Sequence, residues 1–317
     1  MRTLLGLVYL FLLGSCTTGS FVSEKETISS IQDSSFTTPL GKVFAITTPS
    51  AALVSNYDKA MAAHEAQPED VEAWIWWGRR SAYLGQIRRA IAIYSLAIDK
   101  FPKEARLYRH RGHRYLSIRE YDKAIADLEE AARLIEGTED QIEPDGIPNA
   151  LQIPLSTLHT NTYYHLGLGY YLTHRYEVAY QAFLRCRESG TNYDNVVSST
   201  HWLYMIQRRL GNEARADSLL APIEKNAEVI ENQSYAMLCS LYKGWISPES
   251  LVQEAPGSPS NDAVRYGLAN WYLYHGDSSK AQGLFRSLVE EKGFTSFGYL
   301  AAESDLLQFF PPPKNTP

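Results

Sequence analysis

The sequence is short of cysteine, and this shortage limits the chemistry that the chain can carry. Its 317 residues include three cysteines, Cys16, Cys186 and Cys239, and their spacing is not that of a zinc site. Cys186 and Cys239 lie in apolar, helix-forming stretches, where a free thiol acts as a small hydrophobic side chain. We therefore expect two buried thiols, with a disulfide between them as the alternative.

An excess of positive charge is also missing. The formal net charge is -6 and the pI is about 5.8, with no run of lysines and arginines. Such a chain is a poor candidate for nucleic-acid binding, and we expect no nucleic-acid partner. The composition, 44% hydrophobic and 21% charged, is that of a folded protein.

Catalytic and metal-binding motifs are absent from the sequence. It contains no nucleophile elbow, HExxH or CxxC motif. Gly167-Leu168-Gly169 has neither a preceding strand nor a third glycine, so it does not predict a phosphate loop. His110 and His113 stand three apart on one predicted helix, but the arginines around them repel a metal cation. We expect a protein that is not an enzyme and that uses no cofactor or metal.

The first 16 residues carry the features of an export signal. Arg2 precedes an apolar stretch over residues 4–13, which is shorter than the roughly 20 residues of a membrane-spanning helix and typical of a signal-peptide core. The stretch ends in Leu13-Gly14-Ser15-Cys16.

These four residues resemble the lipobox of bacterial lipoproteins. The resemblance implies that residues 1–15 are removed and that Cys16 becomes the lipidated N-terminus, with enough acyl chains for a stable anchor. Thr17 stands where inner-membrane lipoproteins often have Asp, so the resemblance favours the outer membrane, on its periplasmic face. The alternative is an ordinary signal peptide followed by a chance cysteine.

The residues after the cleavage site lack apolar periodicity. They are rich in Ser and Thr and include Pro39-Leu40-Gly41. We predict a flexible tether over residues 16–46, which holds the folded part away from the membrane.

A repeat of 34 residues begins after this tether. Three pairs of small residues are separated by that spacing: Gly78 and Gly112, Ala90 and Ala124, Ala97 and Ala131. The first unit, about residues 71–103, also has Trp74, Trp77, Tyr94 and Pro102 at set positions. A 34-residue period is that of a helix–turn–helix repeat.

This pattern resembles the tetratricopeptide repeat. The resemblance implies an all-α fold, a right-handed superhelix of stacked antiparallel helix pairs, whose concave groove binds proteins or peptides. Small residues allow the two helices of a unit to approach, and Gly85 can end the first helix in a left-handed cap. Further units begin near residues 104, 160, 197, 232 and 262, and a capping helix covers about residues 297–308. The predicted superhelix spans residues 47–310, with a proline-rich tail over 311–317.

One stretch interrupts the repeats. Residues 137–159 contain three prolines and an acidic first half, so they cannot form a continuous helix. They are either disordered or draped over the surface, or they form a structured flap over the groove.

The resemblance also indicates which side chains face the groove. It places Arg79, Arg106, Arg109 and His113 there, and the arrangement resembles the carboxylate clamps of chaperone-binding family members, although their Asn is missing here. The alternative is that these bases pair with the acidic insert or with neighbouring repeats. Tyr164 and Tyr171 continue the groove in the third unit.

An aromatic and partly basic groove suits an extended or helical peptide. We therefore predict a membrane-anchored scaffold that binds a protein or peptide in the bacterial envelope. Because aromatic rings also stack on sugars, the alternative is a glycan- or peptidoglycan-binding lipoprotein.

Overall fold

The computed structural model describes residues 28–31, 33, 35–45, 47–253, 259–291 and 293–311. The predicted signal peptide, Cys16 and residues 312–317 of the tail lie outside the described residues. Within the described part, no helix is both long enough and apolar enough to cross a membrane.

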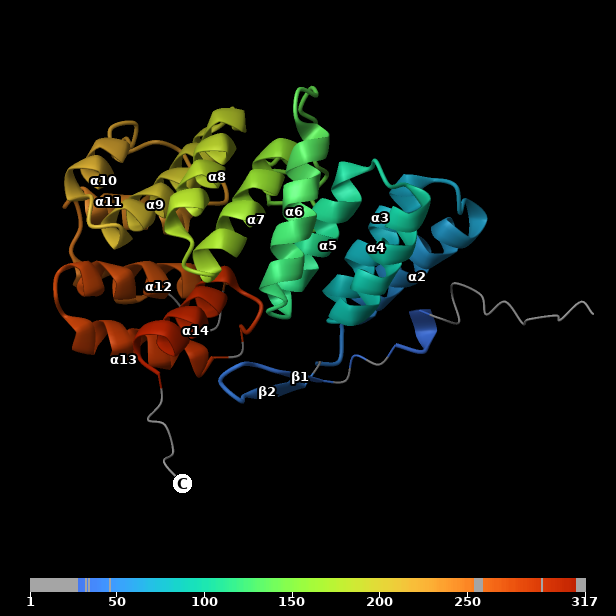
Figure 1. The fold of residues 1–317 in the computed structure, drawn as a ribbon, viewed down its shortest axis with the longest axis horizontal. Coiled ribbons are helices and arrows are strands. Elements are labelled where there is room, and N and C mark those ends of the chain that lie inside the picture. The colour runs from blue at the N-terminus through green and yellow to red at the C-terminus, as the bar shows by residue number, and fades with distance from the viewer. Residues whose placement is uncertain are drawn as a thin grey trace, which may run out of the picture.

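Helices dominate the described chain, and they follow one another in pairs (Figure 1). Their bounds are α2 (Ala51–Ala66), α3 (Val71–Tyr83), α4 (Ile87–Lys100), α5 (Ala105–Ser117), α6 (Tyr121–Ile135), α7 (Leu158–Leu172), α8 (Tyr176–Ser189), α9 (Tyr193–Arg209), α10 (Glu213–Leu219), α11 (Gln233–Tyr242), the 3₁₀ helix η1 (Pro248–Gln253), α12 (Pro259–Tyr274), α13 (Ser278–Val289) and α14 (Phe297–Phe309). Each first helix packs on its own second helix and on the next unit, so the predicted all-α superhelix is confirmed.

The helices of a pair meet at the small residues of the repeat. A Cβ atom on Gly78 would lie 2.4 Å from the Tyr94 ring, and one on Gly112 would lie 2.7 Å from Leu128. Both contacts join residues that are 16 positions apart in their own unit, and the third unit repeats the contact between Gly167 and Phe183. Gly78 and Gly112 are 34 residues apart because each lies where the two helices of its pair approach most closely.

The turn within each pair needs a left-handed residue. Gly85 ends α3 with φ 79°, as expected of a left-handed cap. One repeat later, Arg119 takes the same place with φ 64°, although a side chain disfavours this conformation. The guanidinium of Arg119 binds Glu303 on the distant helix α14.

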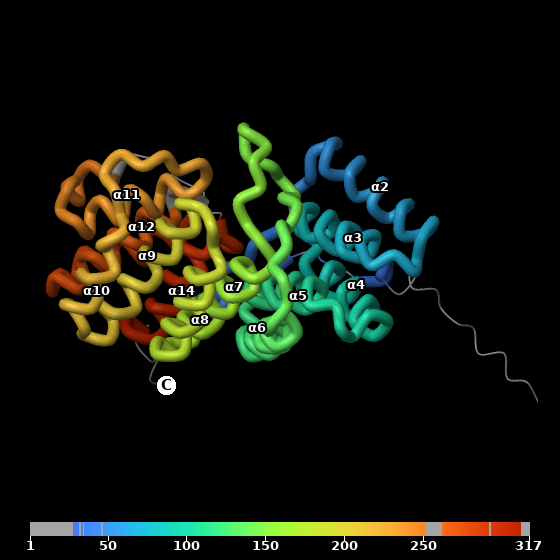
Figure 2. The backbone as a smooth tube through the Cα atoms, turned by 90° about the horizontal axis from the view of Figure 1, so that it is seen from above, coloured from blue at the N-terminus to red at the C-terminus, as the bar shows by residue number. Residues whose placement is uncertain are grey.

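The superhelix does not remain an open rod, because its last helices return to the middle of the chain (Figures 1 and 2). Helix α14 packs on α12, α13 and α7, and α12 also contacts α9. Arg119 Nε lies 2.7 Å from Glu303 Oε2, and Ser304 Oγ donates to the carbonyl of Leu172 at 2.7 Å. The sequence predicted α14 as an end cap; the structure shows that it also closes the molecule on itself.

The tether predicted over residues 16–46 is wrong in its described part. Strands β1 (Ser35–Thr37) and β2 (Val43–Ala45) form an antiparallel hairpin. The Phe44 ring stacks on Phe294 at 4.7 Å, near the start of α14. Ile28 is 1% exposed in the core of the first repeat. Residues 28–45 thus contact both the first repeat and the last, because their few aromatic and aliphatic side chains find apolar sites at both ends.

Candidate functional site

The insert between α6 and α7 forms a strap across the groove, and we call residues 137–157 the strap. It leaves the end of α6, extends beyond the helices and returns to α7 (Figure 2). Its two arms meet where Ile142 pairs with Thr157 and the Glu143 N–H donates to the Ser156 carbonyl at 3.1 Å. Of the two predictions for this insert, the structure supports the flap.

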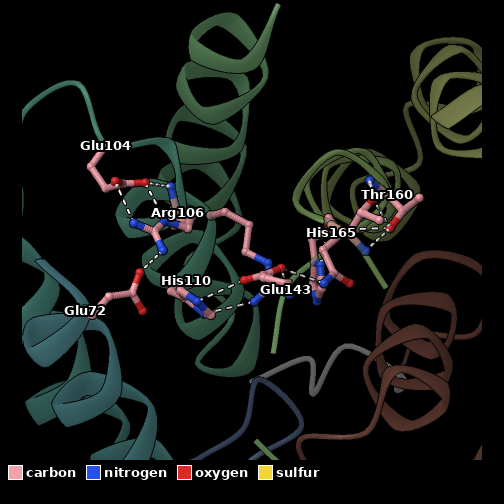
Figure 3. A network of polar contacts seen from close by, with 10 residues as sticks. Glu72, Glu104, Arg106, His110, Glu143, Thr160 and His165 are labelled. Carbon is pink, nitrogen blue, oxygen red and sulfur yellow. Dashed lines mark hydrogen bonds and ion pairs between the residues drawn. The ribbon is translucent and has the colours of Figure 1, made fainter. Parts of the chain in front are cut away.

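The strap places one carboxylate inside the groove, between α5 and α7 (Figure 3). Glu143 is 4% exposed. Its Oε2 lies 2.9 Å from Arg109 Nη2 and accepts a hydrogen bond from Asn161 Nδ2 at 2.6 Å. Its Oε1 lies 3.0 Å from His110 Nε2. Three side chains from two helices therefore hold the strap through a single carboxylate.

The contacts of His110 define its protonation. Its Nδ1 lies 2.9 Å from Arg109 Nη1, which can only donate, so Nδ1 accepts and Nε2 carries the proton toward Glu143. Burial, and then the Arg109 charge, lowers the pKa of His110 to about 3. Burial alone would raise the pKa of Glu143, but Arg109 and then His110 hold it well below its ordinary value. At neutral pH the cluster is one ion pair bridged by a neutral imidazole.

Arg106 is occupied by partners from its own and the preceding repeat. Its Nε lies 2.7 Å from Glu104 Oε1, and its Nη1 binds Glu72 (Figure 3). The hydrogen bonds that Arg106 donates to Glu104 raise the pKa of the Arg106 guanidinium despite its burial. The alternative prediction was that these bases pair with the acidic insert or with neighbouring repeats. Arg109 pairs with Glu143 of the insert, and Arg106 pairs with Glu72 of the preceding repeat.

Two other arginines line an open basic pocket. This pocket, of about 260 Å³, is defined by Arg79, Ala82, Tyr83, Tyr94, Arg109, His110, His113, Arg114, Asp145, Gly146 and Ile147. Arg79 stacks over the Trp76 ring at 4.4 Å. Within the described residues, neither Arg79 nor Arg114 has a carboxylate at ion-pair distance. The basic pocket therefore contains two guanidinium groups that form no ion pair with a described residue.

The remaining predicted groove residues lie deeper than expected. His113 packs between His165, with ring centroids 4.2 Å apart, and Phe297 of α14 at 5.6 Å. The Tyr164 hydroxyl lies 2.8 Å from that of Tyr235. Tyr171 is 1% exposed and belongs to the core. Helix α14 covers this part of the groove, which the repeat pattern alone does not reveal.

A second pocket lies beyond Glu143. It has a volume of about 330 Å³ and is lined by both polar and apolar side chains, and we call it the amide pocket. Its lining includes Asn161, Asn192, Asn195, Asn232, Tyr164, Tyr235 and Phe297. Asn195 is 8% exposed, and its Oδ1 has no hydrogen-bond partner. Amide groups beside aromatic rings can bind peptide bonds or sugar hydroxyls.

Sequence reasoning missed several of these residues. Arg114 follows His110 by four positions and so shares its helix face; that spacing could have revealed it. Glu143 was one of several acidic residues of the insert, and no local signal separates it from the others. Phe297 reaches the groove through the return of α14, which the sequence spacing does not encode.

Known proteins offer likeness in fold alone. No family model and no curated protein matches the chain. Among solved structures, it is similar to YrrB, described as a tetratricopeptide protein with an unusual peptide-binding site (18% identity, 77% of this chain and 98% of that one, TM-score 0.42). It is also similar to a tetratricopeptide repeat protein from Parabacteroides merdae (16% identity, 80% and 92%, TM-score 0.47). The chain is also similar to a putative kinesin light chain from Podosopora anserina with tetratricopeptide-like repeats. The two are 14% identical, the match covers 71% of this chain and 95% of that one, and the TM-score is 0.43. By its own helix pairing and its recurring glycine contacts, the chain is an all-α superhelix of the tetratricopeptide type.

Proposed function

We propose that this chain is a membrane-tethered, non-catalytic scaffold of the bacterial envelope, which binds an extended acidic segment of a partner protein in its groove. One observation carries the proposal: the groove already holds such a segment, the strap, by a buried carboxylate. Because its own chain supplies this ligand, an external segment with the same chemistry would compete for Arg109 and Asn161.

The proposed anchor is a lipid on Cys16, at the outer membrane. Its support is the Leu13-Gly14-Ser15-Cys16 sequence that follows an apolar core. In the native cell we expect metabolic labelling of the full chain with palmitate and its recovery in the membrane fraction. Cys16→Ser should lose the label, and a labelled Cys16→Ser chain would contradict the anchor.

The groove is tested with the strap itself as the probe. A fluorescent peptide of residues 137–147 is titrated into the full chain whose residues 139–145 are replaced by a Gly-Ser linker. Binding should be at least about tenfold tighter than to the unaltered chain, whose groove is filled. A control peptide with Glu143→Gln should bind about tenfold more weakly or worse. Equal affinity of the two peptides, or of the two chains, would rule out the groove as a carboxylate site.

The amide pocket supports a second candidate, a glycan- or peptidoglycan-binding module. Its tyrosines and asparagines match the needs of a sugar ring and its hydroxyls. An array of envelope glycans and muropeptides separates the two candidates. Sugar binding that persists in Arg109→Gln but falls in Asn232→Ala would support the glycan-binding module. The absence of sugar binding would exclude that module and leave the peptide-binding scaffold as the proposed function.

A further inference from the structure

The basic pocket concentrates positive charge that the described residues neutralise only in part. Arg79 comes from α3, and Arg109 and Arg114 come from α5 of the next repeat. Glu143 is held by Arg109 and His110. Asp145 also lines the pocket, yet it forms no ion pair with a described arginine. Arg79 thus has only the longer-range attraction of Asp145, and neither Arg79 nor Arg114 has a described carboxylate at ion-pair distance.

This arrangement costs free energy unless a ligand completes it. Burial, and then the charges of Arg109 and Arg79, hold the pKa of Arg114 below its ordinary value. Like charges in a partly desolvated pocket repel one another more strongly than in water. The Nε–H of Arg109, which is buried, also has no acceptor. Orphaned donors and unpaired cations at one place are typical of an anion-binding site.

We propose that the basic pocket binds a phosphate monoester between the guanidinium groups of Arg79 and Arg114. A phosphate monoester carries a charge of about −1.5 to −2 at neutral pH and three strong acceptor oxygens. Two arginine forks can each bind a pair of these oxygens. A carboxylate has two oxygens and one charge, so it would satisfy one fork and leave the other empty.

The neighbouring side chains can donate further hydrogen bonds to the phosphate oxygens. Tyr83 and Tyr94 line the pocket, and each has an O–H donor. His113 also lines it, and burial holds its pKa well below its ordinary value, so it is a neutral ring that can donate one hydrogen bond. A pocket of about 260 Å³ with an open side admits either a free phosphate or a phosphate at the end of a larger molecule.

Calorimetric titration of the full chain tests the site with four probes. These are inorganic phosphate, O-phosphoserine, a seven-residue phosphoserine peptide and glutamate, which is the carboxylate control. We expect saturable binding of the phosphates and at least about tenfold weaker binding of glutamate. If inorganic phosphate binds as tightly as the peptide, the ligand is a small phosphate; if the peptide binds more tightly, the phosphate belongs to a larger molecule.

Three variants make the result specific. Arg79→Gln and Arg114→Gln should each weaken phosphate binding by about tenfold or more, whereas Arg133→Gln should leave it unchanged, because Arg133 is exposed on α6 and pairs with Glu130. Phosphate should raise the Tm of the unaltered chain but not that of Arg114→Gln. Without phosphate, Arg114→Gln should melt at the same or a higher temperature, since it removes an unpaired charge.

Equal binding of glutamate and O-phosphoserine would overturn the proposal, as would phosphate binding that survives both arginine substitutions. A Tm that phosphate does not change would also count against it. Neither the lipid anchor nor the strap peptide enters these measurements, so a negative result leaves the peptide groove untouched.

Discussion

At the scale of single residues, the size of a side chain decides how closely two helices of a repeat approach. Gly78 faces the Tyr94 ring at a distance that no Cβ atom can share, whereas Gly283 on α13 has no atom within 4 Å of such a Cβ. The sequence predicted Gly78 because the 34-residue spacing repeats it at Gly112. The two glycines have the same chemistry and opposite surroundings.

The two glycines should therefore respond in opposite directions to the same substitution. Gly78→Ala should lower the free energy of unfolding by about 1–3 kcal/mol, because Tyr94 must move. Gly283→Ala should raise it by about 0.5–1 kcal/mol through helix propensity. Urea unfolding followed by circular dichroism measures both, and a stabilising Gly78→Ala would contradict the packing described here.

Glu143 shows where residue-level prediction from sequence ends. Its acidity and the basic groove were both visible in the sequence, but their contact depends on the path of a strap with three prolines. Breaking a buried ion pair by removing one partner costs about 3–5 kcal/mol, so Glu143→Gln should destabilise the full chain by that order. Glu139→Gln, at an exposed strap residue, is the control, and equal effects of the two substitutions would contradict the buried pair.

At the scale of elements, α14 joins segments that are far apart in the chain. Arg119 and Glu303 are 184 positions apart, with side chains 4% and 1% exposed. Helix α14 itself was predictable from its apolar composition and the repeat count. Its docking was not, because the partner of Glu303 is an arginine in a turn where the repeat usually has glycine.

A double-mutant cycle tests this closure. Arg119→Met and Glu303→Leu should each destabilise the chain by about 3–5 kcal/mol, because each leaves a buried charge unpaired. The double variant should recover most of that loss, which a coupling energy of several kcal/mol would report. The exposed pair Glu130 and Arg133 serves as the control, and its coupling should be far smaller because solvent screens both charges. Additive losses at Arg119 and Glu303 would show that α14 docks without them.

At the scale of the whole molecule, burial of neutral histidines makes stability depend on pH. Burial lowers the pKa values of His110, His165 and His201 to about 3, against about 6.5 in an unfolded chain. Between these values the unfolded chain binds more protons than the folded one. The stabilisation is therefore complete above about pH 6.5 and is lost as the pH falls toward 3.

Below about pH 6, the free energy of unfolding should fall by about 1.4 kcal/mol per pH unit for each histidine. For the three together, the slope is about 4 kcal/mol per pH unit. With a typical free energy of unfolding of about 5–15 kcal/mol, the chain should unfold between about pH 3 and 5.5. Urea titrations at several pH values give the slope, and His201→Phe should reduce it by about a third. A free energy of unfolding that is equal at pH 7 and pH 5 would contradict the neutral buried state.

The sequence alone predicted the fold class, the helix pairs and the capping helix, because these depend on local periodicity. It did not predict that the array closes on itself or that residues 28–45 bind both ends of it. Those features depend on contacts between residues that are remote in the chain, such as Phe44 with Phe294.

The packing of residues 28–45 restricts how far the protein can stand from a membrane. If Cys16 is the anchor, eleven residues, 17–27, separate it from Ile28, which is fixed in the first repeat. Such a leash spans about 40 Å at full stretch. Ile28 would then stay within about 40 Å of the lipid surface, so the groove would be reached by molecules close to the bilayer.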